Sequence, residues 1–310
     1  MSSDTLVGGY PSADEANQIN YNTINERSNK MKKLSEIALL ADLTISKWSG
    51  SIADQKTTDE ILDKKNARRD RGRFVKRLLM DVGPLKAITG KMYHEYKMKS
   101  TAWEDGRRLL PVEFFDSITK LHRDCSDELE KALEEFGKNY PEYKEKAKEE
   151  LGDLYDETEF PSFDEFKRKW KIRLDFFPIP ESKHFVVKAE KNLINEMKKS
   201  FDEAINSKQT IAIGEVKERV FETVGKIVER ISDKHMKFSR QGKEVMDSVR
   251  ELVDLLPSLN LFDDPNINKM IDELKTNLYE VTDEELKKKD KRKKILDKTK
   301  AMLDKMSDYA

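Results

Sequence analysis

Four histidines are the first candidates for catalysis or metal binding in this sequence, because imidazole nitrogen serves both purposes. They lie far apart in the chain and form neither an HxxxH nor an HExxH pair: His94, His122, His184 and His235. His122 and Cys125 are three residues apart, a spacing that places both on one face of a helix. Such pairs are more often packing than a nucleophile with its base, so we do not predict nucleophilic catalysis.

Acidic pairs are the second candidates for chemistry. Glu134–Glu135 and Glu149–Glu150 lie among lysines, whereas a catalytic carboxylate dyad needs apolar neighbours that shift its pKa. No GxxxxGK[ST] or GxGxxG phosphate loop is present. The single cysteine excludes an intrachain disulfide and a thiolate metal cage. The sequence therefore predicts a protein that is not an enzyme and uses no metal and no cofactor.

A basic segment at residues 64–77, KKNARRDRGRFVKR, has the composition of an anion-binding site. Its 14 residues include eight basic ones and a single acid, Asp70. The basic residues are Lys64, Lys65, Arg68, Arg69, Arg71, Arg73, Lys76 and Arg77. Arginine forks suit phosphate groups, and each neutralised phosphate releases counterions, so binding would weaken steeply with salt. The segment is a candidate site for nucleic acid or for a protein partner.

An acidic segment at 124–159 offers a second interpretation of the same charges. It contains 14 Asp and Glu against five Lys. Charge segregation of this kind suits self-association or docking to an oppositely charged partner. It equally allows the arginines of 64–77 to pair with the acidic helix of their own chain. Both interpretations stay open at this stage, and a basic cluster at 287–294 could be a second contact.

The composition favours long amphipathic helices. Of 310 residues, 38% are charged and 37% hydrophobic, with only 12 Gly and 9 Pro. We therefore predict a mainly α fold, an elongated helical bundle with a small two-stranded β element and a coiled-coil-like carboxy-terminal region. The amino terminus lacks the pattern of a signal peptide, and no run of about 18 apolar residues could span a bilayer. These features predict a soluble cytoplasmic protein that does not enter membranes.

Two short segments alternate apolar and polar residues and predict strands at 43–48 and 171–177. A lone strand would leave its backbone amides and carbonyls without partners, so we expect the two to pair with each other. Trp48 and Trp170 flank these strands, which favours packing of the indoles over a binding cleft formed with Trp103.

The chain divides into three expected parts: a flexible arm at 1–28, a helical domain at 29–182, and a helical assembly region at 183–310. Within them we expect a helix over 29–41, a helix that carries Phe74, Leu78 and Leu79, and a loop at 100–111 with a tight turn. Pro141 and Pro257 are expected to separate successive helices. Capping boxes predict helix starts after Ser162 and Thr282.

Branched apolar residues follow a coiled-coil spacing of three and four in the assembly region. This predicted assembly seam contains Ile213, Val216, Val220, Val224, Ile227 and Ile231. A seam of this kind can be completed by a second chain, so we expect a homo-oligomer.

Five motifs occur in a fixed order: TISKWSG, ARRDRGRFVKRLL, AWEDGRRLLP, LGDLYDETEFPS and IRLDFFPIP. In this order they resemble a phage-associated family of uncharacterised function, over about residues 40–190. The motif positions that we single out are Thr44, Ile45, Trp48, Gly50, Trp103, Asp105, Gly106 and Pro178. Members of that family are often encoded beside a MoxR-like or cobaltochelatase-like AAA+ ATPase and a von Willebrand A-type protein. The resemblance implies an accessory role near such an ATPase and assigns no catalytic residue.

Our first hypothesis is therefore a non-enzymatic phage accessory protein, an oligomerising helical adaptor that docks a protein partner in the host cytoplasm. The alternative is a nucleic-acid-binding protein that uses the basic segment. A third hypothesis is an inhibitor of a host defence protein.

Overall fold

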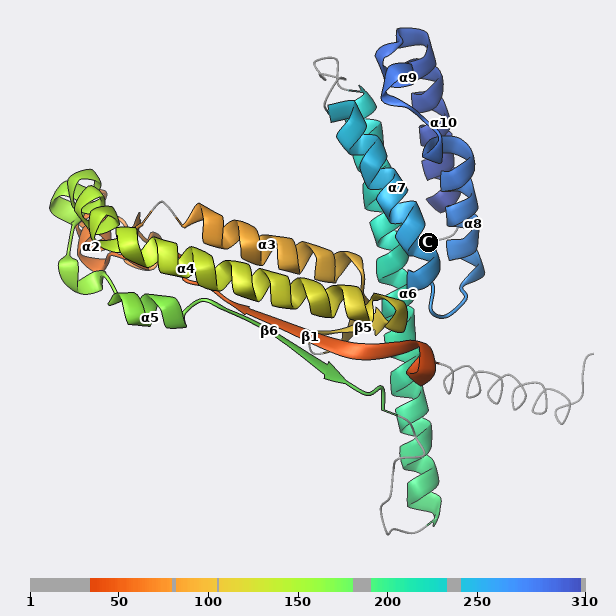
Figure 1. Cartoon of the computed structure of the whole chain (residues 1–310), viewed down its shortest axis with the longest axis horizontal. Coiled ribbons are helices and arrows are strands. Elements are labelled where there is room, and N and C mark those ends of the chain that lie inside the picture. Colours follow the sequence, from red (N-terminus) through yellow and green to blue (C-terminus); the bar gives the residue numbers. More distant parts are fainter. Residues whose placement is uncertain (1–33, 80–81, 105, 181–190, 233–240, 308–310) are drawn as a thin grey trace, which may run out of the picture. The chain divides into compact units, whose positions relative to one another are not determined.

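The fold is mainly α, as the sequence predicts (Figure 1). The computed structural model describes residues 34–79, 82–104, 106–180, 191–232 and 241–307. Its helices in chain order are α2 (Gln55–Lys64), α3 (Gly83–Met98), α4 (Phe115–Leu151), α5 (Phe163–Arg168), α6 (Lys191–Ser232), α7 (Gln241–Leu259), α8 (Pro265–Leu274), α9 (Asp283–Lys287) and α10 (Lys289–Ser307). A π-helical segment, η5 (Lys275–Tyr279), continues α8, and short 3-10 turns η1 (Val112–Phe114), η2 (Gly152–Leu154) and η3 (Glu157–Glu159) border α4.

The chain forms two compact units, and neither is a continuous stretch of sequence. Of the described residues, unit 1 takes in those within 34–40, 101–113 and 177–307, and unit 2 takes in those within 41–100 and 114–176. This division differs from the expected boundary at residue 182, because residues 101–113 pack with the carboxy-terminal helices. The expected arm at 1–28 lies outside the described residues.

The described residues contain six strands in two sheets, more than the two that alternation predicts. They are β1 (Ala38–Ser46), β2 (Ser51–Ala53), β3 (Val75–Arg77), β4 (Thr101–Glu104), β5 (Arg107–Pro111) and β6 (Lys171–Phe177). One sheet has the order β4-β5-β1-β6, and in the other β2 pairs antiparallel with β3. The expected pairing of the two alternating segments is confirmed, because β1 and β6 are neighbours. Trp48 lies just beyond the end of β1.

The helix expected over 29–41 is wrong in its second half. Residues 34–37 are helical, but the backbone is extended from Ala38 onward. Ala38 and Leu40 are buried in the core of unit 1 together with Trp103 and Leu109. Partners in a sheet therefore override the helical preference of this Ala- and Leu-rich stretch.

A β-hairpin replaces the loop expected at 100–111. β4 pairs antiparallel with β5, and Glu104 lies opposite Arg107 across a two-residue connection. Gly106 has φ +81, which is the left-handed conformation that a tight turn needs and that glycine adopts without strain. The predicted turn is thus present at Gly106, while Asp105 lies outside the described residues.

The carboxylate of Glu215 on α6 joins this hairpin to the helices of unit 1. Its oxygens accept hydrogen bonds from Arg108 Nη2 at 2.7 and 2.8 Å and from the backbone N–H of Ala102 on β4. Arg219 adds an ion pair at 3.4 Å. Burial would raise the pKa of Glu215, but the charge of Arg108 and these hydrogen bonds outweigh it and lower the pKa. The ionised carboxylate therefore holds β4 against α6.

The predicted assembly seam is buried inside unit 1. Five of its six residues, Val216, Val220, Val224, Ile227 and Ile231, are at most 3% exposed, and Ile213 is half-buried. Helix α6, which carries them, contacts α7, α8 and α10 of the same unit (Figure 1). Heptad-like spacing describes this intrachain packing equally well, so the five buried seam residues are not available to a second chain.

Neither expected proline break occurs, because α4 continues through Pro141 and α7 through Pro257. A proline inside a helix removes one hydrogen bond and crowds the carbonyl four residues earlier. For Pro141 that residue is Gly137. Next to the proline, Tyr140 is buried and donates a hydrogen bond to the Pro161 carbonyl at 2.7 Å, and this tertiary contact supports the helix at this point.

An aromatic cluster around Phe166 forms the end of unit 2 near α5. Phe166 is fully buried and stacks on Phe136 at 4.8 Å between ring centroids, with Trp48 edge-on at 5.4 Å and Trp170 at 6.1 Å. The prediction that these tryptophans pack is confirmed. The predicted capping box of Ser162 with Glu165 is also present and starts α5 beside the cluster.

Gly137 provides a test of this packing. A Cβ at Gly137 would overlap Cζ of the Phe163 ring, whereas a Cβ at Gly90 on α3 would meet nothing within 4 Å. We expect Gly137→Ala to destabilise the protein by about 1–3 kcal/mol through overpacking, despite the better helix propensity of alanine. Gly90→Ala should stabilise it by about 0.5–1 kcal/mol. Chemical denaturation of both variants measures the difference, and equal effects would contradict this interpretation.

Replacing the buried carboxylate tests the contact between α6 and the hairpin. We expect Glu215→Gln to cost about 1–3 kcal/mol at pH 7, because Arg108 and Arg219 lose their counter-charge. The pKa of Glu215 is lowered in the folded state, so its contribution is complete above its unfolded pKa and disappears as pH falls through the folded value. Urea denaturation from pH 7 to pH 3 should therefore show the wild type and the variant converging at acid pH. A gap that stays constant with pH would rule this account out.

Candidate basic binding surface

A small module of β2, α2 and β3 in unit 2 carries the basic segment. Asp54 caps the first turn of α2 by accepting a hydrogen bond from the Thr57 N–H at 2.9 Å. Asn66 adopts φ +49 just after the helix, and the backbone N–H of Ala67 bonds to the Leu62 carbonyl. The chain then returns as β3, which pairs antiparallel with β2, so the helix expected around Phe74–Leu79 is wrong. The basic segment therefore begins at the end of α2 and ends in β3.

Seven of the eight predicted basic residues are exposed. Lys64, Lys65, Arg68, Arg69, Arg71, Arg73 and Arg77 are exposed, and they are named below as the basic surface. Val75 and Arg77 flank Lys76 on β3, and both are exposed while Lys76 is buried. A two-residue alternation in a strand places neighbours on opposite faces, which separates Lys76 from Arg77.

Lys76 has a structural role instead. Its ammonium lies 2.7 Å from Glu159 Oε2 and 3.3 Å from Asp54 Oδ2, and it donates a hydrogen bond to the Leu154 carbonyl at 2.7 Å. Burial would lower the pKa of Lys76, but the hydrogen bonds to Glu159 and Asp54 outweigh that effect and raise it. The charged lysine thereby fixes β3 to the segment that follows α4.

The expected pairing of the arginines with the acidic segment at 124–159 is not present among the described residues. Glu159 belongs to that segment, but its partner is Lys76. Arg68 and Arg71 contact Asp70 at 3.1 and 3.9 Å, and all three side chains are more than half exposed. Exposed pairs of this kind contribute about 0–1 kcal/mol and compete weakly with another anion. The basic surface is therefore accessible to a ligand.

His122 and Cys125, the pair weighed above for nucleophilic catalysis, both lie in packed surroundings in unit 2. His122 Nε2 lies 3.4 Å from the Ile172 carbonyl. Cys125 is fully buried, and burial raises the pKa of its thiol above the usual range, so the thiolate form is disfavoured. This is the arrangement of a packed cysteine, as its spacing with His122 suggests.

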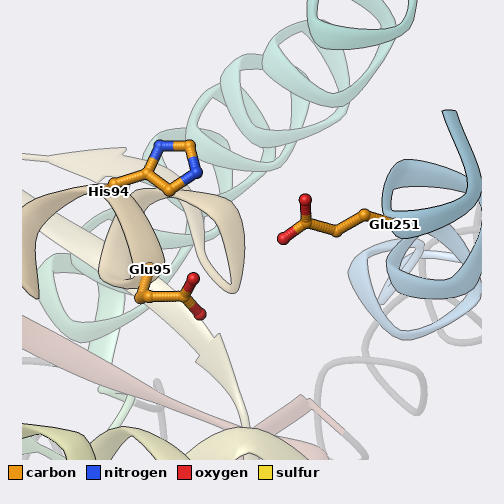
Figure 2. Close-up of side chains that lie close together, drawn as sticks. All are labelled: His94, Glu95 and Glu251. Carbon is orange, nitrogen blue, oxygen red and sulfur yellow. The ribbon is translucent and has the colours of Figure 1, made fainter. Parts of the chain in front are cut away.

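Figure 2 labels His94, Glu95 and Glu251, three side chains that each offer one metal-ligand atom. His94 and Glu95 are neighbours on α3 in unit 2, and Glu251 belongs to α7 in unit 1. Within either unit they supply at most two ligands, and Glu95 also pairs with Lys99 at 3.1 Å. We assign no metal site to them.

The motif positions fall into both units and do not make a single site. Thr44, Ile45, Trp48 and Gly50 belong to unit 2, and Trp103, Gly106 and Pro178 belong to unit 1. Gly50 has φ +72 and, as expected, makes a sharp turn, where its carbonyl accepts a hydrogen bond from the Leu78 N–H. Pro178 directly follows β6 and ends it. These positions explain turns and strand ends rather than chemistry.

No family model, curated protein or solved structure matches the chain. Among the described helices, none has the length and apolar character needed to cross a lipid bilayer. The functional argument therefore depends on the basic surface itself. The sequence identified the basic residues but not Asp54 and Glu159, the acids that form ion pairs with the buried Lys76.

Lys76 allows a direct test of how the module is held. We expect Lys76→Met to destabilise the protein by about 2–4 kcal/mol, because two carboxylates and a carbonyl lose their buried cation. The matched control is Arg77→Met, an exposed change on the same strand that should shift stability by at most about 0.5 kcal/mol. Thermal or urea denaturation compares them, and equal losses would show that Lys76 does not anchor β3.

Proposed function

We propose that this protein is a non-enzymatic phage accessory protein of the host cytoplasm that binds nucleic acid through the basic surface of unit 2. The observation that carries the proposal is the exposure of seven basic side chains within 14 residues of sequence, none of them covered by the acidic segment in the described structure. The motif resemblance supports the phage context, and the basic surface supports the ligand.

Arginine is suited to this ligand. Its planar guanidinium donates two parallel hydrogen bonds to phosphate oxygens and keeps its charge at any physiological pH. Arg68, Arg69, Arg71 and Arg73 lie in the connection between α2 and β3. Its first end is held by the hydrogen bond from the Ala67 N–H to the Leu62 carbonyl, and its second end by Lys76. Anchored ends reduce the ordering that binding requires. Contacts to phosphates specify no base sequence, so the expected recognition is of the backbone.

The acidic residues elsewhere in the molecule restrict where a nucleic acid can bind. The net charge is −1, so acidic residues elsewhere balance the basic surface. The acidic α4 segment would repel a polyanion, and the basic surface would attract it. Such a molecule should bind a nucleic acid through this one surface rather than through contacts spread over the whole protein.

Charge reversal tests the proposal. A fluorescent DNA duplex titrated with the full chain should bind at about 50 mM salt and weaken steeply towards 200 mM. Replacing Arg68, Arg69, Arg71 and Arg73 by Glu should abolish binding at 50 mM salt. If binding persists, the negative slope of log affinity against log salt should become shallower by about 3 or more. The charge-matched control replaces Arg123, Lys131, Lys138 and Lys148, four exposed residues of α4, by Glu. Equal losses in both variants, or no binding by the wild type, would refute the proposal.

A second candidate is the adaptor that docks an acidic protein surface. Ile61 on α2 and Val75 on β3 are 44% and 51% exposed, and both belong to the module that carries the basic surface. Exposed aliphatic side chains contribute to a protein interface and have little to contact on a phosphate backbone. The DNA titration above also tests whether these two side chains belong to the nucleic-acid site. The double variant Ile61→Ser with Val75→Ser should leave DNA affinity unchanged, because neither side chain contacts the phosphate backbone. An AAA+ ATPase is the partner class that the resemblance implies.

A further inference from the structure

Strand β6 lies at one edge of the four-stranded sheet of order β4-β5-β1-β6. In the part of the chain that the structure describes, β1 is the one strand beside it (Figure 1). An edge strand presents a row of backbone N–H and C=O groups that can pair with another chain. β6 has seven residues, Lys171–Phe177, which is the length of an ordinary strand.

The two edges of this sheet are treated differently. At the β4 edge, α6 packs against the strand and Glu215 accepts a hydrogen bond from the Ala102 N–H. In β6, the Ile172 carbonyl lies 3.4 Å from His122 Nε2. No other side-chain hydrogen bond to the backbone of β6 exists among the described residues. Within the described part of the chain, the outer edge of β6 is therefore available for pairing.

The sequence of β6 is complementary to itself. In an antiparallel pair of two β6 strands centred on Leu174, Arg173 of each copy lies opposite Asp175 of the other. The same register places Ile172 opposite Phe176. Cross-strand neighbours have Cβ atoms about 4.5–5.5 Å apart, close enough for an ion pair. One register thus provides two symmetric charge pairs, as a twofold interface requires.

The side chains are already oriented for this pairing. Arg173 Nε lies 2.6 Å from Asp175 Oδ2 within one strand, so both point to the same face of the sheet. Their side chains are 62% and 34% exposed, which leaves them reachable by a second copy. The opposite face is fixed in unit 2, because Ile172 is buried and Phe176 packs on Phe115 at 4.8 Å between centroids.

We propose that two copies of this protein form a homodimer by antiparallel pairing of their β6 strands, centred on Leu174 and fixed by reciprocal Arg173–Asp175 pairs. Charges on an edge strand often protect it from pairing, and like charges directly opposite each other destabilise a strand pair. Here opposite signs stand at symmetric positions and attract in the pair. The proposal does not depend on nucleic-acid binding, and it replaces the buried α6 seam as the basis for self-association.

Sedimentation velocity of the full chain over a range of micromolar concentrations tests the dimer. The wild type should show a concentration-dependent dimer. Arg173→Asp places like charges opposite each other twice and should raise the dimer dissociation constant about tenfold or more. Asp175→Arg should do the same. The double variant with both changes restores opposite charges and should dimerise again. Arg168→Asp on α5, an exposed arginine outside the strand, is the matched control and should leave the dimer unchanged.

Mixing gives a second measurement that keeps the test decisive if one variant is less stable. Arg173→Asp and Asp175→Arg should each be monomeric alone and should form a mixed dimer together, because every charge then faces its opposite. A wild type that stays monomeric throughout, a dimer that Arg173→Asp leaves intact, or a mixture that fails to associate would each overturn the proposal.

Discussion

The backbone amides and carbonyls of a strand cannot be satisfied within that strand, and this constraint organises the chain. β1 lies between β5 and β6, so a single nine-residue strand supplies partners in both directions. Its first residues lie in unit 1 and the rest in unit 2. At the β4 edge the constraint is met by a side chain, because the ionised Glu215 accepts the Ala102 N–H. The hairpin and α6 are held together there by a hydrogen bond that a neutral apolar residue could not replace.

The charged side chains discussed above are of two kinds, buried ions with partners and exposed basic residues. Glu215 and Lys76 are each surrounded by opposite charges and hydrogen-bond partners, which is the condition for burying an ion. Lys76 takes up Asp54 and Glu159, so these acids are not available to the arginines nearby. The burial of one basic residue thus contributes to the exposure of its neighbours. On β3, the buried Lys76 and the exposed Arg77 of the basic surface are adjacent residues on opposite faces of the strand.

Local patterns predicted the elements whose signals are contained in a few residues. The alternation of Leu43 and Ile45 and the capping boxes of Ser162 and Thr282 all have the expected consequences. The misses depend on distant partners. The Ala38 stretch is helical by propensity and becomes a strand through the sheet, and the ion pair of Lys76 with Glu159 joins positions that no local spacing connects. The residues of the basic surface were readable from sequence, but their exposure was not, because it depends on where those distant acids pack.

The Glu215 contact has a consequence for protein synthesis. Arg108 and Glu215 are 107 residues apart in the chain. A ribosome that adds about 5–20 residues per second needs roughly 5–20 s to progress from one to the other. Throughout this interval the finished hairpin, with the apolar side chains of Trp103 and Leu109, waits for the helix that will cover it. The nascent polypeptide therefore passes through a stage in which Trp103 and Leu109 lack the core contacts that Ile205 and Phe201 of α6 later provide.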